Sequence, residues 1–413
     1  MSTRRLDSLP SAAQPDRFGD RADLAFAPAD SSLAVRMLPS VRAIPQATWD
    51  ALVGDESSPF VEWAWLDALE ETGCVGPAAG WTIAHLSFWR GGDVVAVVPT
   101  YMKTHGEGEF VFDWAWAEAA ARMRSAYYPK MVVAVPFTPA TGDRVLVAPG
   151  EDRTKVIHTV AIAARELCDP MGTSGVHVLF PRELETAPWQ AAGYLRRDGV
   201  QFHWSRNGAC TWNDYLERFP SKRRNQIKRE LRDVRDRGIE VRTLDAGEIT
   251  VDLARAMYSY YESTVNKHGV WGRLYLNERF FVRIVEAFRH RLAWVMARDR
   301  RSGQALGGAF NVVKGRRMYG RYWGTEGPHA PDIPFLHFVV CYYEGIRHCI
   351  ERGLDVFEPG AGGEHKLARG FVPTRTFSMH WLRNPRLRAA LEPWLERERE
   401  QVAAFVEQSA TEM

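Results

Sequence analysis

The stretch RLAWVMARDRRSGQALGGAFNVVKGRRMYGRYWGT, residues 291–325, decides the predicted fold. It holds three runs rich in β-branched and aromatic residues, separated by the turn sequences RRSG and GRR, and such runs predict consecutive strands. The window 336–352 then carries apolar residues at helical spacing, and DVFEP at 355–359 is typical of a further strand. Antiparallel strands followed by a crossover helix and another strand predict a mixed sheet covered by helices, which is an α/β fold.

The first half of the chain shows the same order of elements. WTIAHLSFWR at 81–90 and VVAVVPTYMK at 94–103 flank the turn GGD at 91–93, which predicts a hairpin. A helical window at 152–168 and the short apolar run VHVLF at 176–180 follow. The recurrence predicts a tandem duplication, in which two halves of the same topology meet across a cleft.

Four segments are expected along the chain. They are a disordered tail at 1–33, a first domain at 34–205, a second domain at 206–384 that holds the active site, and a C-terminal amphipathic helix and tail at 385–413. The C-terminal helix is expected to close the fold or to mediate self-association. A length of 413 residues agrees with two domains, because a single core rarely grows beyond about 300 residues.

Composition excludes several classes of protein. The net charge of +2 gives the chain no overall field that would collect DNA. The five cysteines are odd in number and never spaced as C-x-x-C, which favours reduced thiols over disulfides or a zinc site. The N-terminus lacks the apolar core of a signal peptide, and no stretch approaches the roughly 20 apolar residues of a membrane span. A soluble, cytoplasmic protein is therefore expected.

The segment SKRRNQIKRELRDVRDR, residues 221–237, carries the clearest charge pattern. On a helix, one edge is cationic and the neighbouring face is apolar; the edge holds Arg224, Lys228, Arg232 and Arg235, and the face holds Ile227, Leu231 and Val234. We expect Lys222, Arg224 and Lys228 to bind the phosphates of a substrate. The alternative is a solvated charged face without a ligand.

The loop FEPGAGGEHKLARGF, residues 357–371, combines four glycines with charged side chains. Glycines let a backbone approach a ligand closely, and a histidine with a pKa near neutrality can accept a proton from an attacking amine. We expect His365 to be that base, with Glu364 or Glu358 orienting it or acting in its place. Lys366 and Arg369 are expected to hold anionic oxygens. The alternative is a purely structural turn.

Two aromatic segments in the second half offer further candidates. Along the strand that holds YGRYWG, residues 319–324, we expect Arg321 and Trp323 to share one face and Tyr322 to point to the other. Arg321 is expected to bind substrate, and Tyr322 could protonate a leaving thiolate or alkoxide, unless it is a core residue whose hydroxyl meets a carbonyl.

The long helix carries a polar edge that is composed of His337, Cys341, Glu344 and His348. These side chains span about 16 Å along one helix, which is too far for a compact tetrahedral site, so no metal is predicted. We expect His337, near the helix start, to contact substrate or to cap the active-site cleft.

In the first half, Asp113 lies among the aromatic residues Phe112, Trp114 and Trp116. With Tyr128, these residues could form a slot for an acyl chain, a sugar or an amine. Packing between the two domains explains the same residues equally well.

Several strings together resemble the FemAB-like predicted N-acyltransferases of the GNAT (acyl-CoA N-acyltransferase) superfamily, a group linked to peptidoglycan biosynthesis or recognition. They are EFVFDWAW at 109–116, YYPKMVVAVPFTPATG at 127–142, QFHW at 201–204, SKRRNQIKRE at 221–230, YGRYWG at 319–324, LHFVVCYYEGI at 336–346 and the loop at 357–371. The resemblance implies tandem GNAT-like domains, each a mixed, mostly antiparallel sheet flanked by helices. One departure is TEGPHAPDIPF at 325–335, whose single glycine differs from the glycine-rich loop that cradles the CoA pyrophosphate in GNAT enzymes.

The resemblance also implies transfer of an acyl or aminoacyl group from a thioester or ester donor to an amine. The donor would be acyl-CoA or aminoacyl-tRNA, with no tightly bound cofactor, and tRNA and a second copy of the chain stay open as partners. No G-x-S-x-G motif or Ser-His-Asp arrangement is found, which favours direct attack by the amine. The competing hypothesis is a noncatalytic protein that recognises a peptidoglycan precursor or another cell-envelope ligand in the same cleft.

Overall fold

The computed structural model describes residues 25–26, 32–267, 273–327 and 333–411. Most of the predicted tail at 1–33 lies outside these ranges. Within it, the two-residue strand β1 (Ala25–Phe26) pairs with β2 (Ala34–Leu38).

The smaller of two sheets belongs to the first half and has the order β1-β2-β4-β5-β8. Strands β4 (His85–Arg90) and β5 (Asp93–Val98) form the predicted hairpin, in which Arg90 opposes Asp93 across the two-residue turn Gly91-Gly92. Strand β8 (Leu146–Val147) completes the sheet on the far side of β5. The hairpin prediction is confirmed because the turn residues and the flanking β-rich runs favour the same structure.

The larger sheet has the order β11-β12-β13-β14-β15-β10-β16-β9-β7-β6-β3 and runs through both halves. The strands of the second half are β11 (Ile239–Thr243), β12 (Val295–Asp299), β13 (Ala305–Lys314), β14 (Arg317–Thr325), β15 (Val356–Glu358) and β16 (Val372–Leu382). Those of the first half are β3 (Trp81–Ile83), β6 (Thr100–Lys103), β7 (Lys130–Val133), β9 (Gly175–Leu179) and β10 (Leu195–Ser205).

The two halves repeat one crossover connection. In the first half, β7 and β9 are parallel, and α4 (Arg153–Glu166) lies between them in the chain. In the second half, β14 and β15 are parallel, and α11 (Leu336–Phe338) and α12 (Glu344–Glu351) lie between them. The predicted recurrence of antiparallel strands, helix and parallel strand is therefore present in the structure.

The halves also exchange strands. The end of β10, from the first half, pairs with β15 of the second half, and β16, from the second half, pairs with β9 of the first. Strands β10 and β16 pair with each other in antiparallel register from Leu195↔His380 to His203↔Val372. This exchange joins both halves into one sheet, which the order of elements along the chain does not reveal.

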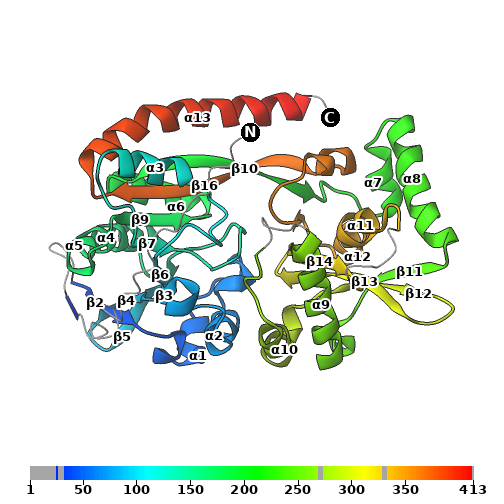
Figure 1. Ribbon diagram of the computed structural model, residues 1–413, viewed down its shortest axis with the longest axis horizontal. Coiled ribbons are helices and arrows are strands. Elements are labelled where there is room, and N and C mark those ends of the chain that lie inside the picture. The colour runs from blue at the N-terminus through cyan, green and yellow to red at the C-terminus, as the bar shows by residue number, and fades with distance from the viewer. Residues whose placement is uncertain (1–24, 27–31, 268–272, 328–332, 412–413) are drawn as a thin grey trace, which may run out of the picture.

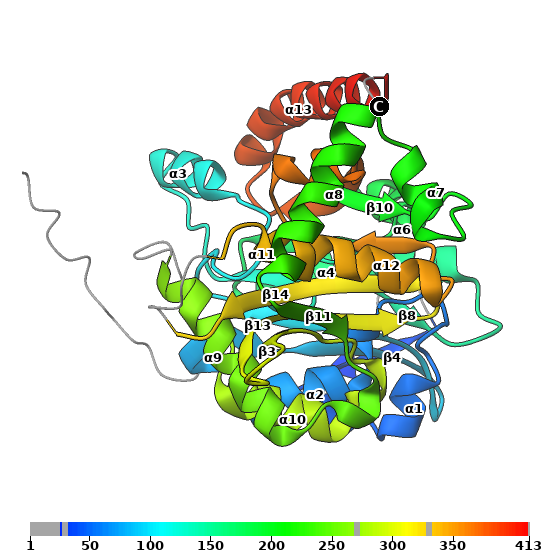
Figure 2. The same cartoon turned by 90° about the vertical axis from the view of Figure 1, so that its right-hand side faces the viewer.

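Helices cover the joined sheet, including its central strands. Figure 1 shows α13 (Pro385–Thr411) lying along β10 and β16, and Figure 2 shows α8 (Ser221–Asp236) crossing in front of α12. The other helices are α1 (Gln46–Asp50), α2 (Trp63–Glu71), α3 (Trp114–Arg122), α5 (Cys168–Met171), α6 (Glu183–Ala191), α7 (Trp212–Glu217), α9 (Val251–Lys267) and α10 (Glu278–Ala287).

One aromatic core joins the two halves. Phe60 and Trp65 come from the first half, and their rings make edge contacts with Tyr319 and Phe280 of the second half at centroid distances of 5.3 and 5.2 Å. All four side chains are buried. Burial of large rings on both sides of the boundary stabilises the halves against each other.

The predicted continuous helix at 336–352 is interrupted. A π-helical turn, Val339–Tyr343, separates α11 from α12, which ends at Glu351 and is followed by Gly353 with φ +69°. A π turn inserts an extra residue, so the side chains before it are rotated relative to the 3.6-residue pattern after it. The apolar stripe predicts the helix, but its regular spacing does not predict this turn.

Candidate active site

A cavity of about 390 Å³ lies where β14 and β15 separate. The two strands pair from Arg317↔Val356 to Tyr319↔Glu358, after which the chain leaves β15 as the loop Pro359–Gly363. The lining residues come from β13, β14, α11, the π turn, this loop and the 3₁₀ segment η9 (Glu364–Arg369): Ala309, Asn311, Gly320, Arg321, Tyr322, Trp323, His337, Cys341, Tyr342, Pro359, Gly360, Ala361, Gly362, Gly363, His365 and Lys366.

A β-bulge in β14 shapes one wall of this cavity. Asn311 opposes Gly320 and Phe310 opposes Tyr322, so Arg321 has no opposite residue in β13. Arg321 Nη2 donates a hydrogen bond of 2.6 Å to the carbonyl oxygen of Phe137, and Tyr322 Oη lies 3.4 Å from the same oxygen. The expected alternation, with Arg321 and Trp323 on one face, is wrong here because the bulge inserts a residue and re-aims its side chain.

The Trp323 ring lies instead against His337, with centroids 4.4 Å apart. The Tyr322 ring packs on Tyr261 at 4.7 Å, and burial raises the pKa of its phenol. Tyr322 thus has the carbonyl contact of a core tyrosine while it also lines the cavity.

His365 meets Tyr342 inside the cavity. Their Nε2 and Oη atoms are 2.8 Å apart, and the His337 ring lies 5.9 Å from that of His365. Gly363, with φ +90°, is required for this placement: a Cβ there would lie 2.7 Å from Cε1 of His365. The glycine therefore leaves room for the imidazole as well as permitting a left-handed backbone.

The two histidines that line the cavity, His337 and His365, have lowered pKa values. Partial burial lowers the pKa of His365 below its ordinary value, and the positive charges of Arg369 and Lys366 lower it further. Burial lowers the pKa of His337 to about 4. At neutral pH both imidazoles are therefore uncharged, and a neutral imidazole has a nitrogen that can accept a proton.

Lys366 is a buried ammonium without a carboxylate neighbour. Its side chain is 2% exposed, and Nζ donates to the carbonyl oxygen of Gly360 at 2.7 Å. Within the described residues it makes no ion pair, and burial lowers its pKa to about 8. A cation held by carbonyl groups beside a cavity can interact with an anion that forms there.

Two predicted residues are engaged away from the cavity. Arg369 is buried, pairs with Glu230 at 3.1 Å and lies over the Phe338 ring at 3.3 Å. Glu358, also buried, pairs with Arg317 at 3.1 Å. The structure does not place either side chain on the cavity surface, because each is paired with another charged side chain.

Other predicted residues lie in different parts of the fold. Glu364 is exposed and lines a separate, larger cavity. Asp113 is buried in the first half, where it accepts hydrogen bonds from Tyr127 at 2.6 Å and from Lys130. Tyr128 lies beside Lys130, whose Nζ is 5.5 Å from its ring centroid. The Asp113 carboxylate is thus paired with a buried lysine, and the expected slot for a substrate around it stays a prediction.

The cationic edge of α8 is divided. Lys222 lines the larger cavity, whereas Lys228, Arg232 and Arg235 line a hollow of about 430 Å³ beside β11. Arg224 lies between them and donates to Ser221 Oγ at 3.2 Å. Within the described residues, no group of three His, Cys, Asp or Glu side chains is arranged to hold a metal ion.

The comparisons with known proteins cover most of the chain. Residues 40–413 match the model of the FemAB-like family, described as peptidoglycan biosynthesis/recognition. The chain belongs to this FemAB-like family. No curated protein matches it.

Solved structures show the fold of this FemAB-like chain. FemX is 12% identical, with a TM-score of 0.51 over 84% of this chain and 98% of FemX. The C-terminal domain of a protein described as a lysylphosphatidylglycerol synthetase from Agrobacterium fabrum is 10% identical, with a TM-score of 0.52 over 84% and 95%. A tandem GNAT protein from the clavulanic acid pathway is 13% identical, with a TM-score of 0.42 over 85% and 98%. The predicted α/β fold and family are confirmed.

Two features of the site in this FemAB-like chain were not predicted from the sequence. They are the contact of Tyr342 with His365 and the presence of Asn311 in the cavity wall. Asn311 is 2% exposed, and its Nδ2 has no hydrogen-bond partner among the described residues. Tyr342 lies within the quoted string LHFVVCYYEGI, but only the π turn brings its hydroxyl to the cavity. None of the described helices is long and apolar enough to cross a bilayer.

Proposed function

We propose that the protein transfers an acyl or aminoacyl group from a thioester or ester donor to an amine, in the cavity between β14 and β15. One observation carries this proposal: a neutral histidine, His365, contacts Tyr342 while the buried ammonium of Lys366 lies beside the same cavity. A proton acceptor and an anion-stabilising group at one site are what amine acylation requires.

In this mechanism His365 is the base. When its Nε2–H donates to Tyr342 Oη, the lone pair of Nδ1 is free to accept a proton from the attacking ammonium. The amine then attacks the carbonyl carbon, and the oxyanion of the tetrahedral intermediate is stabilised by Lys366. Collapse breaks the bond to the leaving thiolate or alkoxide, and the extra proton of the attacking nitrogen passes to this leaving group through the Tyr322 hydroxyl or water, so that Tyr322 ends as it began.

Direct attack is favoured over a covalent acyl-enzyme. Cys341 is the thiol that lines the cavity, and burial raises its pKa well above the ordinary value. A thiol rather than a thiolate is therefore present at neutral pH, and the thiol is a poor nucleophile.

The pH dependence of the reaction should show two limbs. The rate should rise with pH through the lowered pKa of His365, below 6.5, because the base must be neutral. It should fall as pH rises through about 8, where Lys366 loses its charge. Measurement of kcat/KM from pH 5 to 9.5 tests both limbs. In Lys366→Arg the fall near pH 8 should disappear, and its persistence would contradict the role of Lys366.

The donor and the activity itself can be tested together. Purified protein is incubated with labelled acyl-CoA or charged tRNA and with candidate amines, including a peptidoglycan-precursor peptide, which the family description supports as an acceptor. Formation of a labelled amide supports the transferase. Tight binding of the precursor without transfer from any donor would favour the noncatalytic recognition protein.

Phosphate contacts from α8 form a further prediction. Lys222 and Lys228 are exposed and line two hollows. Replacement of both by glutamine should weaken binding of a phosphate-bearing substrate by more than the ~1 kcal/mol typical of one exposed ion pair, because two charged contacts are lost together. Calorimetric titration at several salt concentrations measures the effect, and the wild-type affinity should fall as salt rises. Unchanged or salt-insensitive affinity would contradict the assignment of these lysines and of Arg224.

A further inference from the structure

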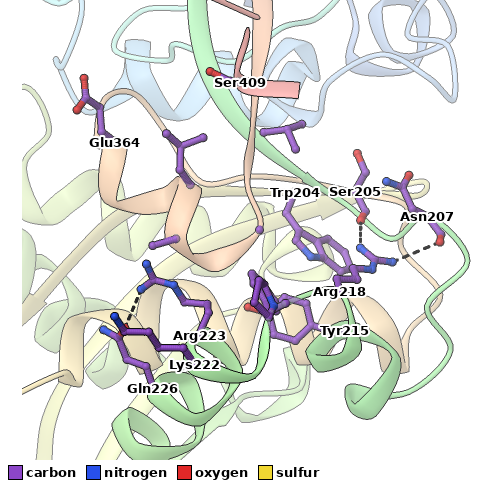
Figure 3. Close-up of a pocket in the computed structure, with 16 residues that line it drawn as sticks. Trp204, Ser205, Asn207, Tyr215, Arg218, Lys222, Arg223, Gln226, Glu364 and Ser409 are labelled. Carbon is purple, nitrogen blue, oxygen red and sulfur yellow. Dashed lines mark hydrogen bonds between the residues drawn. The ribbon is translucent and has the colours of Figure 1, made fainter. Parts of the chain in front are cut away.

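A second cavity, of about 770 Å³, lies on the other side of the 3₁₀ segment η9 (Glu364–Arg369) from the reaction cavity. Figure 3 shows it between η9, the start of α8 and the end of β10. The residues of η9 are divided between the two spaces: Glu364, Leu367 and Ala368 line the second cavity, and His365 and Lys366 line the reaction cavity. The volume of the second cavity is in the range of pockets that bind small molecules.

The floor of the second cavity is apolar. Its accessible surface comes from the half-buried Phe219, Leu367 and Val372, and Trp204 and Tyr215 also line it as fully buried side chains. Gly370, with φ +80°, also lines the floor. A Cβ at this position would lie 3.0 Å from Cζ of Phe219, so a glycine lets the backbone approach this ring. Trp204 and Tyr215 are fully buried, so their ring faces are used in packing and are not free for stacking with a nucleobase.

The rim is cationic. Arg218 is held by carbonyl oxygens of the β10 end, including that of Ser205 at 2.9 Å, and Arg223 donates to Gln226 at 2.9 Å. Lys222 is exposed and makes no ion pair within the described residues. Glu364, at the edge, is the one carboxylate among the lining residues. The rim thus has an excess of positive charge beside an apolar floor.

We propose that this cavity binds an amphiphilic anion, that is, an alkyl or acyl chain with a phosphate or carboxylate head. The chain would displace water from the apolar floor, and Lys222 and Arg223 would pair with the head. A bare phosphate leaves the floor unused, and a neutral lipid leaves the cations unpaired. This site shares Lys222 with the phosphate contacts of the proposed transferase, whereas Arg223 and the apolar floor belong to this cavity alone. Its occupancy is measured by binding rather than by transfer, so a failure of the site and a failure of the transferase are distinguishable.

The test is calorimetric titration of the full-length protein with butyl, hexyl and octyl phosphate. Each added methylene should tighten binding by about fourfold if it is buried, so octyl phosphate should bind up to roughly 10²-fold more tightly than butyl phosphate. Lys222→Gln with Arg223→Gln should weaken octyl phosphate about tenfold or more. Leu367→Trp, which fills the floor, should remove the dependence on chain length.

Arg229→Gln is the matched control, because Arg229 is an exposed cation of the same helix that does not line the cavity. It should leave the affinity unchanged, and thermal melting of each variant shows that the fold is retained. Equal affinity for butyl and octyl phosphate would overturn the proposal, as would equal weakening by the rim and control variants. Competition with octanoyl-CoA or with dihexanoyl phosphatidylglycerol shows whether the natural ligand of the cavity is a soluble thioester or a membrane lipid. Displacement of octyl phosphate by one of them supports the site, and displacement by neither overturns it.

Discussion

The His365→Ala variant should lose about 10²- to 10⁴-fold in kcat for amine acylation while it melts at the wild-type temperature. His365 is exposed at the cavity, although its ring borders Tyr342 and Phe338, so its removal takes away the base and little buried surface. Single-turnover measurement with a saturating amine gives the rate of the chemical step. A variant that melts early but keeps its kcat would show that His365 is structural.

Two further variants distinguish the base from its surroundings. Gly363→Ala keeps His365 but introduces a Cβ 2.7 Å from its Cε1, so the ring must move and kcat should fall. Tyr342→Phe removes the hydroxyl that orients the ring, and we expect a smaller loss, with a shift in the acid limb of the pH profile. An identical pH profile in Tyr342→Phe would contradict a positioning role for Tyr342.

Replacement of Lys130 by methionine should destabilise the fold by about 3–5 kcal/mol. Lys130 is fully buried, its Nζ lies 2.8 Å from Glu109 Oε2, and it also pairs with Asp113. Removal of the cation leaves two buried carboxylates without their counter-charge. Urea unfolding followed by circular dichroism measures the loss, and a change below about 1 kcal/mol would contradict this assignment.

This loss should grow with pH. Burial raises the pKa of Glu109 from 4.5 to about 7, so the folded state favours the protonated carboxyl, and stability falls as pH rises from about 4.5 to 7. Lys130 opposes that rise, and without it the folded pKa moves higher still. The deficit of Lys130→Met should therefore be larger at pH 8 than at pH 5. Adding Glu109→Gln should recover part of it at pH 8.

Local patterns along the chain determined most of the elements. The hairpin at Gly91-Gly92, the amphipathic helix at 221–236 and the strands from 295 to 325 form as predicted, because turn residues and apolar spacing act over a few neighbouring residues. The strings at 109–142 and 319–371 also predicted the FemAB-like family. His337, His365 and Lys366 were identified as candidates from residue type and a glycine-rich setting, and the structure places all three at one cavity.

Only the tertiary structure decided which side chains share a site. The bulge at Arg321 and the π turn that turns Tyr342 toward His365 break the regular periods on which sequence prediction depends. In the sequence, Glu358 and Arg369 are as good candidates as Lys366, but ion pairs with Arg317 and Glu230 hold them away from the cavity. The carbonyl that Tyr322 approaches belongs to a residue 185 positions away. Contacts of this kind depend on the exchange of β10 and β16 between the halves, and the periodicity of a single segment carries no information about a partner so distant in the chain.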